Sequence, residues 1–136
     1  MIGILIVTHG NFGTELLKSA ELIIGKQDNV KTLGLNHGDN VDELYDRVSE
    51  AIKELDNGDG VLVFTDLFGG SPSNVTAANM KNIYFQNITG VNLPMLIEAL
   101  DSRYDIELEE LVDKVCTSGI EGIKNIRSEL FVNSNA

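Results

Sequence analysis

The sequence of 136 residues contains one cysteine, two prolines and no tryptophan. Cys116 cannot form an intramolecular disulfide by itself, and no cysteine or histidine stands near it at the spacing of metal ligands. No apolar run approaches the roughly 18 residues that span a bilayer, and the run from Ile2 to Val7 is too short for the apolar core of a signal peptide. These absences argue against a disulfide scaffold, a zinc site and a membrane span, and we expect a cytoplasmic protein.

Basic side chains are also scarce. Ten Lys and Arg residues against 21 Asp and Glu residues give a formal net charge of -11. This charge repels phosphate backbones and anionic lipid, so we expect no nucleic acid partner. A hydrophobic content of 43% in a chain of this length suits one compact domain with a sizeable core.

Apolar strands and amphipathic helices alternate along the chain. The run Ile2–Thr8 is typical of a strand buried on both faces of a parallel sheet, and it ends at His9. A helical stripe of apolar residues then runs to Gly25, and we expect another helix to begin at Asn40, which together with Glu43 resembles a capping box. We expect the other elements to be strands at Val30–Leu35, Gly60–Thr65 and Ile83–Thr89 and helices at Ser71–Met80, Met95–Leu100 and Leu108–Ile126, the last bent at Gly119.

This alternation predicts a doubly wound α/β fold with a mainly parallel sheet and helices on both faces. In such folds the functional site lies at the carboxyl ends of the strands, where His9 and Asp66 are expected to fall. Ser128–Val132 has the character of a further strand. An apolar strand attached to a completed domain is able to pair with a neighbouring subunit, so we expect this segment to take part in such a contact.

His9 directly follows the first predicted strand and is the candidate phosphoryl acceptor. An unperturbed imidazole is largely neutral near pH 7 and offers one unprotonated ring nitrogen, and attack through that nitrogen places a positive charge on the ring. Asp66 follows the third strand. A carboxylate on the other ring nitrogen would fix the tautomer and stabilise the cation, so we predict that His9 reacts and Asp66 supports it.

The segment Gly69-Gly70-Ser71-Pro72 supplies donors for the oxygens of a phosphoryl group. It offers a pliable backbone, the Ser71 hydroxyl and the positive end of a helix with proline in its first turn. Gly10 lets a phosphate approach the main chain closely. The predicted strand ends carry no cluster of carboxylates of the kind that holds magnesium, so we expect a reaction without a metal or a cofactor.

Each of these residues has an ordinary structural explanation when taken alone, because single histidines and aspartates often serve as hydrogen-bonded or turn residues. A hydrolase built from Ser71, His9 and Asp66 would lack the Gly-x-Ser-x-Gly elbow. A receiver-type domain phosphorylated on Asp66 would need acidic residues after the first strand, where Thr8 and His9 stand. A nucleotide-binding module is the non-catalytic alternative, although neither common phosphate-binding glycine motif occurs.

Three separated strings carry a resemblance to a known family: Val7-Thr8-His9-Gly10, Thr65-Asp66-Leu67-Phe68-Gly69-Gly70-Ser71-Pro72-Ser73-Asn74 and Gly90-Val91-Asn92-Leu93-Pro94-Met95-Leu96. Together they resemble the mannose-family enzyme IIA domain of the bacterial phosphoenolpyruvate-dependent sugar phosphotransferase system. The resemblance covers residues 1–127 and sets residues 128–136 apart as a C-terminal extension. Phe68 stands where many relatives carry tryptophan.

The resemblance implies a phosphotransferase that works through a phosphohistidine. The histidine matched by His9 accepts phosphate on Nε2 from phospho-HPr and passes it to a histidine of enzyme IIB, which serves the membrane components IIC and IID. The residue matching Asp66 holds the other ring nitrogen, and the residue matching Ser71 hydrogen-bonds near the acceptor. The family forms homodimers, often by exchanging a C-terminal strand. A related domain that donates phosphate to dihydroxyacetone kinase is the second reading, but its histidine is usually followed by serine rather than by the glycine found here as Gly10.

Overall fold

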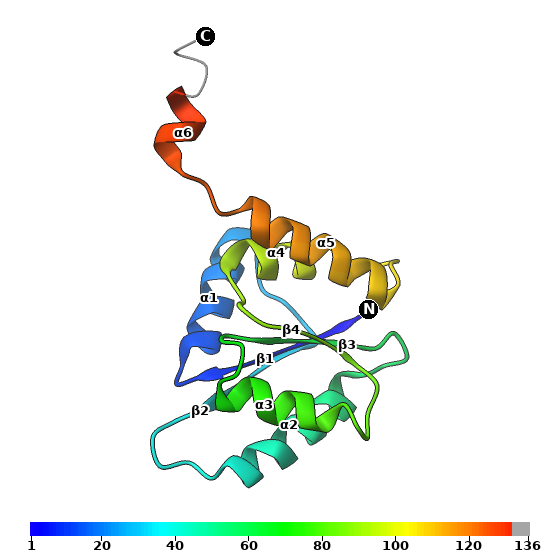
Figure 1. The fold of residues 1–136 in the computed structure, drawn as a ribbon. Helices are drawn as coiled ribbons and strands as arrows, with labels where there is room; N and C mark the ends of the chain where they lie inside the picture. Colours follow the sequence, from blue (N-terminus) through cyan, green and yellow to red (C-terminus); the bar gives the residue numbers. More distant parts are fainter. Residues whose placement is uncertain (132–136) are drawn as a thin grey trace.

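A parallel sheet of four strands forms the centre of the molecule, and helices cover both of its faces (Figure 1). The structure is a computed structural model that describes residues 1–131. The strands lie in the order β2-β1-β3-β4, and every neighbouring pair is parallel. They are β1 (Gly3–His9), β2 (Val30–Leu35), β3 (Val61–Thr65) and β4 (Gln86–Ile88). The predicted α/β fold is therefore confirmed.

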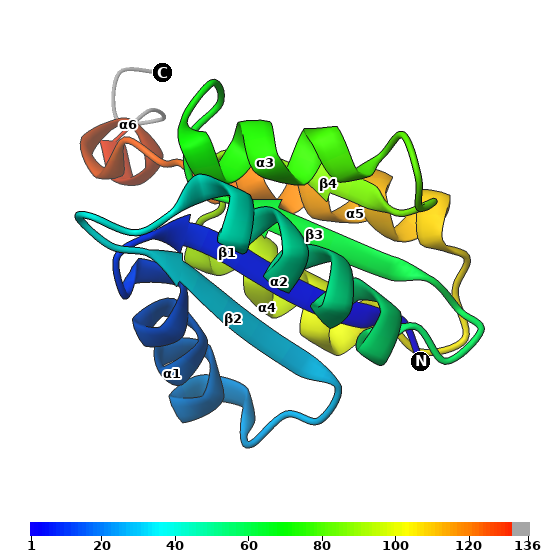
Figure 2. The same cartoon turned by 90° about the horizontal axis from the view of Figure 1, so that it is seen from below.

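The helices divide between the two faces of the sheet (Figure 2). One face is covered by α1 (Phe12–Ile24), α4 (Leu93–Ser102) and α5 (Leu108–Glu121). The other face is covered by α2 (Val41–Leu55) and α3 (Ser71–Asn79). A short helix, α6 (Ile126–Phe131), projects from the body of the molecule (Figure 1).

Strand side chains alternate between two apolar cores, because successive residues of a strand point to opposite faces of the sheet. Ile4, Ile6 and Phe64 pack in the core beneath α1, α4 and α5. Leu5 and Val7 pack in the core beneath α2 and α3. Burial on both faces explains why the strands appear in the sequence as nearly continuous apolar runs.

The parallel register brings the carboxyl ends of neighbouring strands together. His9 is the register partner of Leu35, and Val7 is the partner of Thr65. The loops that follow β1, β2 and β3 therefore leave the sheet at the same edge. The helix start predicted at Asn40 is in place, because Asn40 Oδ1 accepts the backbone N–H groups of Asp42 and Glu43. Ser71, expected as an N-cap, is instead the first residue of α3, and Gly70 is the N-cap.

Two predicted elements differ in length from the observed ones. The strand expected at Ile83–Thr89 is reduced to Gln86–Ile88. The helix expected at Met95–Leu100 is longer and begins at Leu93, because Asn92 Oδ1 accepts the backbone N–H of Met95 and caps the first turn.

The predicted last helix is divided into α5 and α6. The interruption falls after Glu121 and not at Gly119, through which α5 continues. Gly119 serves packing instead, because a methyl group on its α-carbon would overlap the side chain of Met95 in α4. This position thus allows α4 and α5 to approach closely.

The strand predicted at Ser128–Val132 is wrong for the part of it that the structure describes. Residues Ile126–Phe131 form α6, and Val132 lies outside the described residues. Asn125 supports the helix start, because its side chain accepts the N–H of Ser128 and its carbonyl accepts that of Glu129. A helix makes its hydrogen bonds within its own segment, whereas a strand needs a partner strand. The predicted division between residues 127 and 128 falls inside α6 and stays a prediction.

Among residues 1–131 no helix is both long enough and apolar enough to cross a membrane.

Candidate functional site

His9 lies at the carboxyl end of β1, with the chain turning immediately after it. Gly10 adopts a positive φ of 55°, and its N–H donates to the Leu35 carbonyl at 2.8 Å. This turn leaves the His9 side chain at the edge of the sheet with a relative exposure of 49%. The ring is thus accessible to a second protein.

Asp66 directly follows β3 and holds His9 in two places. Its Oδ2 atom accepts the backbone N–H of His9 and also lies 2.9 Å from the ring nitrogen Nδ1. An ionised carboxylate only accepts hydrogen bonds, so Nδ1 carries the proton in this contact and the lone pair of a neutral ring is on Nε2. The predicted pairing of His9 with Asp66 is present in the structure.

The environment of Asp66 keeps this carboxylate charged. Burial raises the pKa of Asp66, but the hydrogen bonds from the His9 backbone and ring, together with the charge of that ring, outweigh burial and bring the pKa below its ordinary value of 3.8. Asp66 is therefore an anion at neutral pH. It provides a fixed negative charge beside one nitrogen of the ring.

Gly70 packs against the opposite part of the imidazole. A methyl group on its α-carbon would lie 2.9 Å from Cε1 and 3.5 Å from Nε2 of His9, so a larger residue would displace the ring. Gly70 is also the N-cap of α3 and has no side chain to bond the first amides of the helix. The beginning of α3 consequently lies next to Nε2.

The first turn of α3 leaves amide donors available. Within the described part of the chain, the backbone N–H groups of Ser71 and Ser73 have no hydrogen-bond acceptor, and Pro72 has no N–H. The Ser71 side chain is exposed, and its hydroxyl makes no hydrogen bond to the His9 ring. Gly69, with a φ of 83°, forms the turn that leads into the helix. Helix N-termini of this kind favour anions.

Two contributors to the site were not predicted from the sequence. Thr8 Oγ1 accepts the N–H of Gly13 at 2.9 Å, while Asn11 at the N-cap of α1 makes no capping bond with its side chain. Asn74 Nδ2 donates to the Gly69 carbonyl at 3.2 Å. The position of Thr8 at a strand end just before a helix is a signal in the sequence for the Thr8 hydrogen bond. Nothing in the sequence pattern indicates the hydrogen bond of Asn74.

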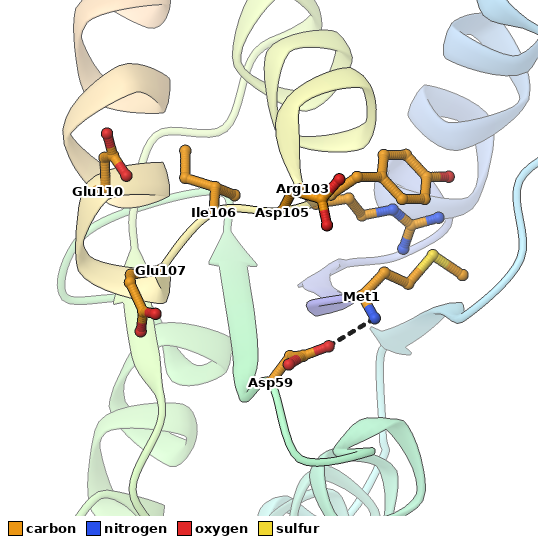
Figure 3. Close-up of a pocket in the computed structure, with 8 residues that line it drawn as sticks. Met1, Asp59, Arg103, Asp105, Ile106, Glu107 and Glu110 are labelled. Carbon is orange, nitrogen blue, oxygen red and sulfur yellow. Dashed lines mark hydrogen bonds and ion pairs between the residues drawn. The ribbon is translucent and has the colours of Figure 1, made fainter.

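A separate pocket lies at the other end of the sheet (Figure 3). It has a volume of about 390 Å³ and includes the N-terminal amine, which is 2.7 Å from Asp59. Met1 and Asp59 precede β1 and β3, so the length of β1, about 20 Å at ~3.3 Å per strand residue, separates this pocket from His9. Carboxylates dominate its lining, which includes Asp59, Asp105, Glu107 and Glu110. Their negative charge does not suit a phosphorylated ligand. In residues 1–131 no group of three or more His, Cys, Asp or Glu side chains is arranged to hold a metal ion.

Comparison with known proteins gives the family of this chain. The sequence profile of EIIA-man, described as PTS system fructose IIA component, matches residues 3–116. The chain belongs to the EIIA-man family. EIIA proteins of this family are components of the sugar phosphotransferase system, so the resemblance found in the sequence is confirmed.

Several EIIA-man relatives align over nearly the whole chain. The PTS system mannose-specific EIIAB component of Escherichia coli K12 is 36% identical over 94% of this chain, which spans only 40% of that relative's length. The PTS system fructose-specific EIIA component of Bacillus subtilis is 28% identical, with 95% of this chain and 96% of the relative covered. The crystal structure of phosphotransferase system component EIIA from Streptococcus agalactiae superposes with a TM-score of 0.87 at 36% identity, covering 94% and 99% of the two chains.

Proposed function

We propose that this chain carries a phosphoryl group on Nε2 of His9 and moves it from phospho-HPr to a histidine of enzyme IIB. The observation that carries the proposal is the 2.9 Å contact between His9 Nδ1 and Asp66 Oδ2, which leaves Nε2 as the reactive nitrogen. Nε2 lies beside Gly70 at the start of α3, where an incoming phosphoryl group would meet backbone donors. Membership of the EIIA-man family supports the same role.

The transfer exchanges one nitrogen–phosphorus bond for another. The Nε2 lone pair of His9 forms a bond to phosphorus while the bond from phosphorus to the imidazole of phospho-HPr breaks. The Nδ1 proton stays in place, so His9 becomes a phosphorylated imidazolium. The donor ring enters as the same kind of cation, protonated on the nitrogen that does not carry phosphorus, and therefore leaves as a neutral imidazole. Asp66 faces the new cation and stabilises it. The same steps in the opposite direction deliver the group to enzyme IIB, and because the two bonds are alike, the rate depends mainly on placement.

The phosphoryl oxygens would be held by the first turn of α3. The amides of Ser71 and Ser73 and the Ser71 hydroxyl are unused within residues 1–131 and lie at the positive end of the helix. The space beside Gly10 and Gly69 is open, because a methyl group on either α-carbon would meet no atom within 4 Å. We assign His9, Asp66 and Ser71 to the transfer step. Gly10, Gly69 and Gly70 provide the space and the backbone that receive the phosphoryl group.

We further propose that the chain works in the cytoplasm as a homodimer and meets the membrane indirectly, through components IIC and IID. Support for these partners comes from the family. Support for a dimer comes from apolar side chains that lie open at the end of α5 and along α6: Ile123, Ile126 and Leu130 are 75%, 64% and 69% exposed.

The proposed function is tested by incubating the chain with phosphoenolpyruvate, enzyme I and HPr and measuring its intact mass. We expect one phosphoryl adduct that is stable in alkali and labile in acid, as a phosphohistidine is. His9→Ala should lose the adduct, while His37→Ala, which alters the other histidine of the chain, should keep it. An unmodified wild-type protein, or an adduct that persists in His9→Ala, would contradict the proposal.

A further inference from the structure

The peptide bond between Gly69 and Gly70 is fixed at both of its polar ends. Its N–H, on Gly70, donates to the Leu67 carbonyl at 3.2 Å. Its carbonyl, on Gly69, accepts a hydrogen bond from Nδ2 of Asn74 at 3.2 Å. Asn74 therefore reaches back from α3 to the loop that leads into the helix.

This peptide would otherwise turn easily. Glycines flank it on both sides, and a glycine restricts its backbone dihedrals less than any other residue. Gly69 has a φ of 83°, and the space around its α-carbon is open, so no packing restrains that side of the bond. On the Gly70 side the α-carbon packs against the His9 ring, whereas the Gly69 carbonyl is held only by its hydrogen bond from Asn74 among the described residues.

The orientation of this peptide matters for His9. The α-carbon of Gly70 lies against the edge of the imidazole, close to Cε1 and Nε2. The Ser71 amide follows immediately, so a rotation of the Gly69–Gly70 peptide would shift both the support of the ring and the nearest phosphate donor. A displacement on the order of 1 Å is enough to slow a reaction that depends on placement.

We propose that Asn74 is a positioning residue for phosphoryl transfer, which holds the Gly69–Gly70 peptide so that the start of α3 stays aligned with Nε2 of His9. This inference rests on the proposed function of His9. Asn74 is exposed and belongs to neither apolar core, so its side chain contributes little to the packing of the fold. Its loss should therefore slow transfer without unfolding the protein.

The experiment compares Asn74→Ala with Asn82→Ala in the full chain. Asn82 is a matched control, because it is also exposed and donates one hydrogen bond through Nδ2, to the Tyr45 hydroxyl and away from His9. Transfer from phospho-HPr is measured by rapid quench over a range of phospho-HPr concentrations. We expect Asn74→Ala to lower kcat roughly tenfold with little change in KM, and Asn82→Ala to match wild type.

A second readout separates positioning from general damage. In ¹H–¹⁵N spectra of Asn74→Ala, we expect the Gly69 and Gly70 amide signals to shift or broaden, while the His9 ring nitrogens keep their signals because Asp66 still holds them. An unchanged kcat, a loss confined to KM, an equal loss in Asn82→Ala, or failure of Asn74→Ala to fold would overturn the inference. If wild type itself takes no phosphoryl group, the proposed function fails instead.

Discussion

At the scale of single residues, the site depends on one oxygen atom that holds one histidine twice. Asp66 Oδ2 accepts from the backbone of His9 and faces its ring at Nδ1. The backbone bond places the end of β1, and the ring contact sets the tautomer. A neutral side chain of the same shape would retain part of the geometry but would not supply the negative charge.

We therefore expect Asp66→Asn to slow phosphoryl transfer by roughly 10-fold to 100-fold, by analogy with the loss of a carboxylate that orients a metal-bound histidine. The physical reason is that the phosphorylated imidazolium loses its counter-charge. Rapid-quench transfer from phospho-HPr measures the effect. Asp59→Asn, which alters an exposed carboxylate at the other end of the sheet, should transfer at the wild-type rate. Equal rates for Asp66→Asn and wild type would reject the assigned role.

The low pKa of Asp66 also predicts how stability depends on pH. A carboxyl whose pKa is lower in the folded state than in the unfolded state stabilises the fold fully above the unfolded value, near 3.8, and loses this contribution as the pH falls through the folded value. Urea unfolding of wild type and Asp66→Asn should thus give a difference in unfolding free energy that is constant near neutral pH and shrinks below about pH 4. If this difference in unfolding free energy grew on acidification, the pKa of Asp66 would be raised by folding rather than lowered.

At the scale of elements, Thr8 connects the strand that carries His9 to the helix that follows. Thr8 is fully buried, and its hydroxyl is the acceptor for the N–H of Gly13 in the first turn of α1. Gly13 is required there, because a methyl group on its α-carbon would lie 2.9 Å from the Ile6 side chain. The contact between β1 and α1 thus depends on the Thr8 hydroxyl and on the absence of a side chain at Gly13.

Replacing this hydroxyl should cost stability. In Thr8→Val the N–H of Gly13 stays buried without an acceptor, and we expect the unfolding free energy to fall by about 1–3 kcal/mol. Thr8→Ser keeps the hydroxyl and loses one methyl group, at a cost of about 1 kcal/mol. Urea denaturation of both variants provides the comparison, and a Thr8→Val protein as stable as wild type would show that the hydrogen bond is unimportant.

The elements also show which parts of the fold and of the site can be predicted from the sequence. Strands such as Gly3–His9 were predictable because burial on both faces leaves a local apolar run, and the pairing of His9 with Asp66 followed from two parallel strands ending at one edge. The strand predicted at Ser128–Val132 is wrong for residues 128–131, because apolar residues in a short segment suit a helix as well as a strand. A strand would need a neighbouring strand to pair with, which the local sequence does not reveal. Asn74 was missed because a side chain that bonds a loop leaves no periodic pattern.

At the scale of the whole molecule, α6 is a helix that does not pack against the sheet or against the helices that cover it. None of its residues is buried, and it extends away from the sheet and its helices (Figure 1). Its exposed apolar side chains need a partner surface if the protein is to avoid open hydrophobic area. A second copy of the chain is the partner that we propose.

Light scattering coupled to size exclusion tests this assembly. Wild type should elute as a dimer, and the double variant Ile126→Asp with Leu130→Asp should elute as a monomer, because charges placed in an apolar interface cost several kcal/mol each. Met80→Asp is the control, since Met80 is an exposed apolar residue at the end of α3, on the other face of the sheet. A monomeric wild type, or a double variant that remains dimeric, would contradict the prediction.

The half-exposed ring at the end of β1 has one further consequence for the proposed cycle. Because Nε2 of His9 can be reached by only one protein at a time, phospho-HPr and enzyme IIB must bind successively to the same surface. The donor has to depart before the recipient can dock, which gives ping-pong kinetics with no ternary complex. Unphosphorylated HPr then competes with enzyme IIB for the phosphorylated chain. When phosphoenolpyruvate runs out and unphosphorylated HPr accumulates, this competition lowers the rate of transfer to enzyme IIB.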